Sequence, residues 1–169
     1  MSHEALAHRH INHALWSVCF SACGCNTFDK QTSTPATVNL WVVFPADRAE
    51  QMAIGAWLSS DADFGGYWTP ARENILNAEE KLEDFLRQNS DQFNREPPVW
   101  EQLNNYKRQY AGVIPKDGPV IYGNFFCSDT GIDWKQEWVF VLDGGDCFFQ
   151  LQFDMESGTF MGLMVNGEA

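Results

Sequence analysis

Residues 106–127 read YKRQYAGVIPKDGPVIYGNFFC, and this stretch decides the fold. Residues 106–114 and 120–127 are rich in aromatic and β-branched side chains, which favour extended strands. Between them lies Pro-Lys-Asp-Gly at residues 115–118, a sequence typical of a tight turn. The stretch therefore predicts two antiparallel strands joined by a short turn.

The alternation of strand and turn continues after this hairpin. Residues 137–142, 147–153 and 159–165 have strand composition, and Gly- and Asp-rich turns separate them at residues 143–146 and 154–158. A longer connection, residues 128–133, precedes the first of these strands. We therefore expect four or more antiparallel strands arranged as a meander.

The segment before the hairpin has the pattern of an amphipathic helix. Thr69 suits the N-cap position and Pro70 the first helical position. Apolar side chains then recur on one face until about residue 89, at Ile75, Ala78, Leu82, Phe85 and Leu86. A second short helix is expected at residues 98–104. Because such a helix can cover one face of a sheet, the sequence predicts an α+β fold with a cystatin-like or nuclear-transport-factor-like layout.

Composition divides the chain into four parts. Residues 1–25 form a candidate secretory or lipoprotein leader, and residues 26–36 are polar and rich in Thr and Ser, as in a linker. Residues 37–66 predict a strand and a helix that pack on the domain. Residues 67–169 form the α+β domain itself.

The leader hypothesis depends on a short apolar run that ends in cysteines. Residues 14–22 are mostly apolar, and Cys23-Gly24-Cys25 follows. An apolar core of about 7–15 residues ending in small residues is typical of a secretory signal. A small residue followed by Cys fits lipoprotein processing, so Cys23 and Cys25 are the candidate lipid-attachment residues. The cationic start is weak, because Glu4 opposes Arg9, and a cytoplasmic protein is the alternative.

Four short motifs carry a family resemblance. Residues 67–70 read YWTP, residues 106–112 read YKRQYAG, residues 144–150 read GGDCFFQ and residues 165–169 read VNGEA. Together they resemble a group of bacterial proteins, many of them exported or lipid-anchored, over roughly residues 67–169. The resemblance implies a location in the cell envelope, periplasmic or lipid-anchored, and it implies no activity.

The net charge of −12 argues against nucleic-acid binding, and the short apolar runs argue against a membrane-spanning helix. Nucleic-acid binding depends on clustered Lys and Arg that neutralise phosphates, whereas this chain has 11 Lys and Arg against 23 Asp and Glu, without a cluster. No apolar run reaches the roughly 20 residues that a membrane-spanning helix needs. We therefore expect no nucleic acid and no transmembrane span, and a protein is the partner class that we favour.

The pattern of reactive residues nominates no catalytic, metal or cofactor site. All four histidines lie within the first thirteen residues, so the usual Ser–His and Cys–His arrangements are not expected in the domain. The acidic turn residues lack the regular spacing of a calcium loop. No Gly-rich loop joins a strand to a helix, as phosphate binding would require.

Cys127 and Cys147 are the two cysteines of the predicted domain. In a simple meander Cys127 closes one strand and Cys147 opens the strand after next, which places the two sulfurs at opposite ends of the sheet. A disulfide needs Cα atoms within about 7 Å of each other. We therefore expect two separate buried thiols, unless residues 128–136 bend back.

Aromatic side chains give the best candidate binding surface. Successive residues of a strand point to opposite faces, so the Phe-Phe pairs at residues 125–126 and 148–149 each place one ring on each face. The helix covers one face, and the other is covered by residues 37–58, which we favour, or by a partner or ligand. The candidate binding residues are Tyr110, Phe126, Trp134, Trp138 and Phe149.

Two functional hypotheses follow from these observations. The first is a non-enzymatic, exported or lipid-anchored protein that presents a sheet face or groove to a protein partner. The alternative is a small-ligand-binding or hydrolytic domain with a pocket between helix and sheet, where carboxylates and Tyr106, Tyr110 or Tyr122 would act.

Overall fold

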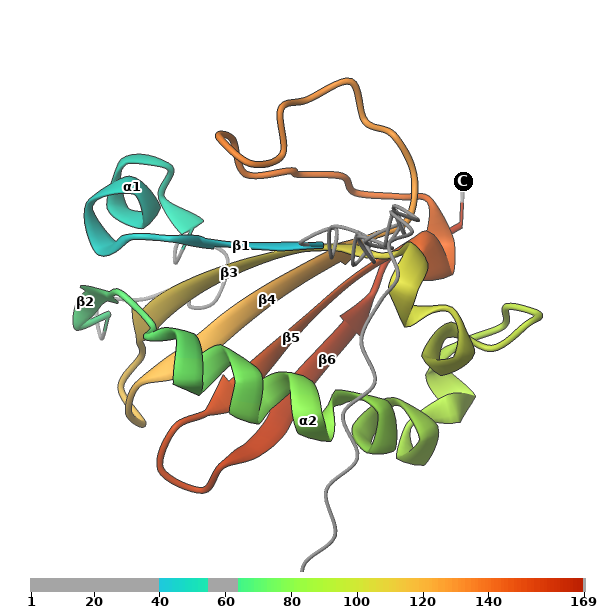
Figure 1. Cartoon of the computed structure of the whole chain (residues 1–169), viewed down its shortest axis with the longest axis horizontal. Helices are drawn as coiled ribbons and strands as arrows, with labels where there is room; N and C mark the ends of the chain where they lie inside the picture. Colours follow the sequence, from blue (N-terminus) through green and yellow to red (C-terminus); the bar gives the residue numbers. More distant parts are fainter. Residues whose placement is uncertain (1–39, 55–63, 169) are drawn as a thin grey trace, which may run out of the picture. The chain divides into compact units, whose positions relative to one another are not determined.

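A computed structural model describes residues 40–54 and 64–168 (Figure 1). The candidate leader and linker, and with them Cys23 and Cys25, lie outside the described residues. Among the described residues, no helix combines the length and apolar composition needed to cross a bilayer. In chain order the elements are β1 (Trp41–Phe44), α1 (Ala46–Gln51), β2 (Gly66–Trp68), α2 (Arg72–Gln88), η2 (Ser90–Gln92), η3 (Val99–Glu101), η4 (Leu103–Asn105), β3 (Lys107–Ile114), β4 (Val120–Phe126), η5 (Gly145–Cys147), β5 (Phe148–Asp154) and β6 (Thr159–Val165).

The strands form one sheet of six strands in the order β1-β3-β4-β5-β6, and β2 also pairs with β3 (Figure 1). The predicted hairpin is β3 and β4, in which Lys107 lies opposite Phe126 and Val113 opposite Val120. Strands β4, β5 and β6 are antiparallel neighbours, whereas β1 runs parallel to β3. The structure therefore confirms a mixed α+β fold with a mostly antiparallel sheet.

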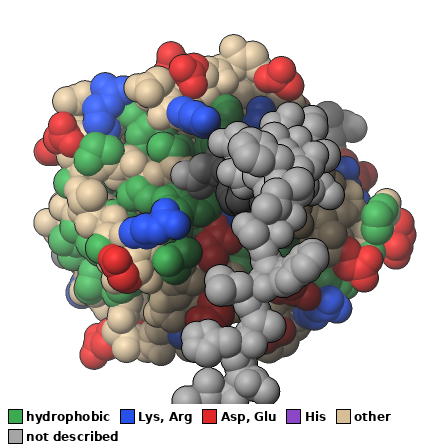
Figure 2. Space-filling model, viewed as in Figure 1, with side chains coloured by type: hydrophobic (Ala, Val, Ile, Leu, Met, Phe, Trp, Pro, Cys, Tyr) green, Lys and Arg blue, Asp and Glu red, His purple; other side chains and the backbone are tan. Residues whose placement is uncertain are grey.

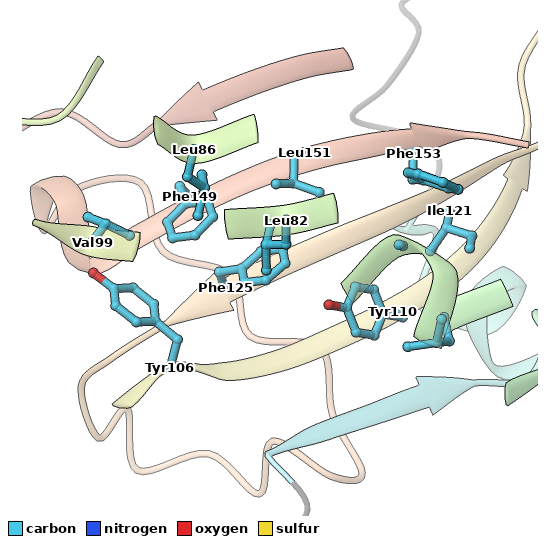
Figure 3. Close-up of a cluster of buried hydrophobic side chains, with 12 residues drawn as sticks. Leu82, Leu86, Val99, Tyr106, Tyr110, Ile121, Phe125, Phe149, Leu151 and Phe153 are labelled. Atoms are coloured by element: carbon cyan, nitrogen blue, oxygen red, sulfur yellow. The ribbon is translucent and has the colours of Figure 1, made fainter. Parts of the chain in front are cut away.

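Helix α2 covers one face of the sheet, here named the helix face (Figure 1). Its buried side chains recur every three or four residues, as expected for one stripe of an amphipathic helix: Ile75, Ala78, Leu82 and Leu86. They pack with apolar residues of β3, β4 and β5 (Figure 3). At the centre of this core the rings of Phe125 and Phe149 stack with their centroids 4.6 Å apart.

Thr69 does not cap α2, so that prediction is wrong. The helix begins after Ala71, whose N–H donates to Asn74 Oδ1 at 2.9 Å. Thr69 Oγ1 instead accepts a hydrogen bond from Ala46 N at 2.9 Å, at the start of α1. Because this partner is distant along the chain, local sequence did not reveal it.

A polar group ties α2 to β3 inside the helix face. Tyr110 Oη donates to Glu79 Oε1 at 2.6 Å, and Arg108 Nη1 lies 3.1 Å from Glu79 Oε2. Arg108 Nη2 also donates to Leu103 O at 2.7 Å. Burial, and the carboxylate of Glu79 beside it, raise the pKa of Tyr110 well above its ordinary value. The hydroxyl therefore stays a donor at neutral pH, and we interpret the group as a structural link between helix and sheet.

Two separate segments cover the opposite face of the sheet, here named the second face (Figure 1). Around α1, Phe44 and Ala49 pack with Ala111 of β3. Residues 128–144, here named the covering segment, pass over the part of the face toward the end of β4, where Val139 packs with Phe126. Residues 37–58 were expected to cover this face, and in the structure the described part of them covers only one end of it.

The covering segment takes the place of a predicted strand. Residues 137–142 have strand composition, but they form no strand, because the backbone of Val139 bonds to side chains of the sheet instead. Strand β5 is therefore the direct antiparallel neighbour of β4, with Phe126 opposite Phe148.

This arrangement overturns the expectation of two separate thiols. Cys127 follows the end of β4 and Cys147 precedes the start of β5, so the two cysteines are adjacent across the ladder. Their Cα atoms lie 5.1 Å apart, and they form a disulfide. Cys127 N also donates to Cys147 O at 3.0 Å. The expectation failed because it placed residues 137–142 as a strand between them.

Candidate functional site

Two buried side-chain amides hold the covering segment on the second face. Gln109 of β3 donates from Nε2 to Trp134 O at 2.6 Å and to Glu137 O at 2.7 Å, and its Oε1 accepts from Val139 N at 2.9 Å. Asn124 of β4 donates from Nδ2 to Val139 O at 2.8 Å and to Gln109 Oε1 at 3.0 Å. Every amide N–H of Gln109 and Asn124 therefore has an acceptor. The N–H and C=O of Val139 bond to these two side chains, as they would bond to the backbone of a neighbouring strand.

Two further amides extend this network toward β5 and β6. Gln150 Nε2 donates to Asn124 Oδ1 at 3.3 Å. Asn166, just after β6, donates from Nδ2 to Val141 O at 2.6 Å and to Asp143 O at 3.1 Å. The covering segment is thus bonded to β3, β4 and the residue after β6, and these bonds fix its height above the sheet from residue 134 to residue 143.

A groove of about 370 Å³ opens between the covering segment and the outer strands. Its floor comes from Tyr122, Asn124 and Gln150, which lie on the second face of β4 and β5. Residues 138–142 form one side, and Met164 with residues 165–167 forms the other. The ring of Trp138 stacks on Tyr122 with centroids 5.7 Å apart, which closes one end of the floor.

Large apolar side chains are exposed around this groove. Phe140 is 47% exposed, Leu142 77% and Met164 51%, and all three line it. Met161, also on β6, is 45% exposed. Scattered apolar residues are normal on a protein surface, but several around one concave site are typical of a binding surface.

The chain that forms both sides of the groove carries charged side chains of one sign, whereas Arg48 and Lys135 lie beside residues 134–136, before the groove side begins. None of the described residues that line it is charged. Residues 136–168 contain no Lys or Arg, and their acidic residues are Glu137, Asp143, Asp146, Asp154, Glu156 and Glu168. On the face shown in Figure 2, acidic and basic side chains both lie at the outline and nearer the middle. An apolar groove in this setting complements a ligand that carries apolar and cationic groups.

A second cleft, of about 610 Å³, lies between α2 and the β5–β6 turn. It brings together side chains of both charges with Phe85 and Phe160. Lys81 Nζ donates across it to Gly158 O at 2.7 Å. In the part of the chain that the structure describes, no three His, Cys, Asp or Glu side chains lie close enough to hold a metal ion.

The five aromatic residues predicted for binding lie in different environments. Tyr110 and Phe149 are buried in the helix-face core, and Phe126 is buried beneath the covering segment. Their rings are enclosed and do not line an open face. Trp134 and Trp138 lie in the covering segment, and Trp138 lines the groove.

Sequence reasoning missed Phe140, Leu142, Met164 and Asn166. In a regular strand at residues 137–142, Phe140 and Leu142 would share one face of the sheet, so nothing marked them as the side of a groove. One signal was present. Gln109 precedes an apolar run in β3 and Asn124 interrupts the otherwise apolar β4, which indicates that something polar, such as a backbone, lies on that face.

We expect Asn124→Leu to lower the free energy of unfolding by about 1–3 kcal/mol, because it leaves Val139 O and Gln109 Oε1 short of a buried donor. Limited proteolysis should then cut the covering segment faster. Urea unfolding and mass mapping of the fragments measure both effects. Gln152→Leu, on the same face of β5, is the control. Equal stability and equal cleavage of the two variants would contradict the anchoring role.

Burial raises the pKa of Tyr122 to about 12, so its neutral form is favoured in the folded state. This contribution to stability is complete below the ordinary tyrosine pKa of about 10, and it is lost as the pH rises from there to about 12. We expect Tyr122→Phe to lose less unfolding free energy than the wild type between pH 8 and pH 11. Urea unfolding at the two pH values measures the difference. Equal losses would show that Tyr122 is not the group responsible.

Comparison with protein-family models, curated proteins and solved structures finds no match to this chain.

Proposed function

We propose that the protein is a non-enzymatic, exported or lipid-anchored binding protein that holds an extended segment of a protein partner in the groove beside the covering segment. One observation carries the proposal: Phe140, Leu142 and Met164 are exposed around a groove whose floor and rim hold side-chain amides. The exposed apolar side chains supply surface that a bound partner can bury, and the fixed amides can orient that partner through hydrogen bonds.

The groove suits a peptide backbone. Gln150 on its floor and Asn166 on its side carry amide oxygens of the kind that accept from main-chain N–H, while the N–H groups of Asn166 donate to Val141 O and Asp143 O. Strand β6 lies beside it at the outer edge of the sheet, and among the described strands none pairs with its outer side. An edge strand next to side-chain pockets is the arrangement by which extended segments add to a sheet.

The charge pattern favours a partner segment that carries Lys or Arg among its apolar residues. The segment that forms the groove side and β6 is acidic and has no basic residue between residues 136 and 168. Opposite charges at the rim speed association and exclude acidic competitors, whereas the apolar contacts supply most of the affinity.

The same lining supports a binding role over a catalytic one. Among the described residues of the groove, Tyr122 is the one titratable side chain, and its raised pKa of about 12 keeps it neutral. Acid–base catalysis needs a group that titrates near the working pH. The groove therefore offers hydrogen bonds and apolar contacts at neutral pH, not a proton.

The proposed envelope location is supported by the apolar run at residues 14–22, by Cys23 and Cys25, and by the family resemblance over residues 67–169. The disulfide Cys127–Cys147 is also typical of proteins that fold in oxidising compartments. As part of the same proposal, the long helix across an antiparallel sheet represents a cystatin-like or nuclear-transport-factor-like layout.

A second candidate function is small-ligand binding in the cleft between α2 and the β5–β6 turn. Glu80, Lys81 and Asp84 converge there with Phe160, which gives a polar ligand both charged and apolar contacts. In this case ligand binding would change the backbone NMR shifts of α2 residues and not those of the covering segment.

The groove can be tested with two synthetic ten-residue peptides, one alternating leucine with lysine and the other leucine with glutamate. We expect the lysine peptide to bind with micromolar affinity, and the glutamate peptide to bind at least about tenfold more weakly because of the acidic rim. Backbone NMR shifts on titration should map binding to residues 138–142 and to β6.

Matched variants separate groove binding from charge attraction alone. Leu142→Ser and Met164→Gln should each weaken binding of the lysine peptide several-fold, because they remove exposed apolar groups of the groove. Leu76→Ser is the control, since Leu76 is 47% exposed on α2, on the other side of the sheet. Equal weakening in all three variants, or shifts confined to the α2 cleft, would refute the groove proposal.

The location can be tested by cell fractionation with intact-mass measurement. We expect a chain found in the envelope fraction, cleaved before Cys23 or Cys25, or at a nearby signal site. A full-length, unmodified chain in the cytosol would overturn the envelope proposal and leave the groove proposal standing.

A further inference from the structure

The disulfide Cys127–Cys147 lies at a surface depression. Both cysteines are only partly buried. Cys147 lines the depression together with Arg95, Asp146 and Glu168, and its volume is about 370 Å³. A small reductant can therefore approach this disulfide in the folded protein, which is not the case for a disulfide enclosed in a core.

A cation faces one sulfur of the pair. Arg95 Nη1 lies 2.9 Å from Cys127 Sγ. The rest of the surroundings hold the segment that carries Arg95 in place: Asp146 Oδ2 accepts from Asn94 N at 2.6 Å, and Tyr106 Oη donates to Asp146 O at 2.8 Å. A guanidinium beside a sulfur stabilises the thiolate more than the thiol, and a more stable thiolate leaves faster from a disulfide.

We infer that Cys127–Cys147 is a thiol-exchange site for a dithiol reductant, with Arg95 positioned to stabilise Cys127 as the leaving thiolate. A thiolate of the reductant attacks Cys147 Sγ, the Cys127–Cys147 bond breaks, and its electron pair stays on Cys127 Sγ. The second thiol of the reductant, as its thiolate, then attacks the mixed disulfide and releases Cys147 as a thiolate, which takes up a proton. The reductant leaves as its own disulfide, having given two electrons to the cystine.

The reduced cysteines stay close enough to reoxidise. Strands β4 and β5 are paired along their whole length, and Cys127 N donates to Cys147 O beyond the last pair. This ladder does not depend on the sulfur bond. The site is therefore able to open and close while the sheet remains folded.

Reduction would also affect the groove, a step that rests on the proposed function. The covering segment lies entirely between Cys127 and Cys147, so the disulfide closes the loop that carries Phe140 and Leu142. Without it the segment is held by the amides of Gln109, Asn124 and Asn166. We expect a more mobile groove side and weaker binding of an extended segment.

The exchange site is tested by the rate at which dithiothreitol reduces the full-length protein under native conditions, with thiols trapped by alkylation and counted by mass spectrometry. We expect Arg95→Met to slow reduction by about tenfold and Arg95→Lys to slow it less, because the lysine keeps the charge. Arg87→Met is the control: Arg87 is an exposed arginine paired with Glu83 on α2. A rate unchanged by Arg95→Met, or lowered equally by Arg87→Met, would overturn the role of Arg95.

A measurement on the unaltered protein guards against a variant that fails to fold. If the site is open in the native state, the reduction rate will be independent of urea well below the unfolding transition. A rate that rises with the unfolded fraction would show that the disulfide reacts only after unfolding, and the inference would fail.

The link to the groove is measured by titrating the lysine peptide against oxidised and reduced protein. We expect several-fold weaker binding after reduction, and an unchanged affinity would overturn the link. If the peptide does not bind the oxidised protein either, the proposed function fails together with this link. The exchange site is judged separately, because its rate measurements involve no peptide.

Discussion

Two buried carboxamides, those of Gln109 and Asn124, need hydrogen-bond partners on the second face, and the course of the chain over that face supplies them. Both lie among apolar neighbours, where an amide without partners costs about 1–3 kcal/mol. Helix α2 cannot supply partners, because it lies on the other face. The backbone at residues 134–139 supplies them, so the chain has to cross β3 and β4 with Val139 between the two amides.

The same requirement explains why a groove exists. A backbone bonded to side chains lies one layer above the sheet, whereas a strand would lie within it. Residues 138–142 therefore stand over β4 as the side of a groove, and the second face of β5 and β6 stays open beside them around Gln150 and Met164. Phe140 and Leu142 belong to this raised backbone, which explains how a sequence typical of a buried strand leaves two large side chains at the surface.

Local sequence patterns predicted the elements whose hydrogen bonds are local or belong to the ladder. The turn at residues 115–118, strands β3 to β6 and the apolar stripe of α2 all follow from spacing and composition. The course of residues 137–142 could not be predicted, because composition favours a strand and the deciding partners, Gln109 and Asn124, are distant along the chain. The same wrong strand led to the prediction of two separate thiols, because one extra strand would separate the cysteines. Of the candidate site, Trp138 was expected, and the groove around it depends on that unpredicted course.

The covering segment is held by two kinds of restraint, and they respond to different conditions. The amides fix its height, and no change of pH near neutrality alters them, because amides do not titrate and Tyr122 on the groove floor has a pKa of about 12. The disulfide fixes the distance between the ends of the segment, and a chemical step can remove it while the sheet stays folded. The restraints on the groove side are therefore insensitive to pH near neutrality, and we expect them to be sensitive to thiols. If the proposed exchange at the disulfide takes place, thiols would therefore loosen the groove side at pH values where the amides hold it unchanged.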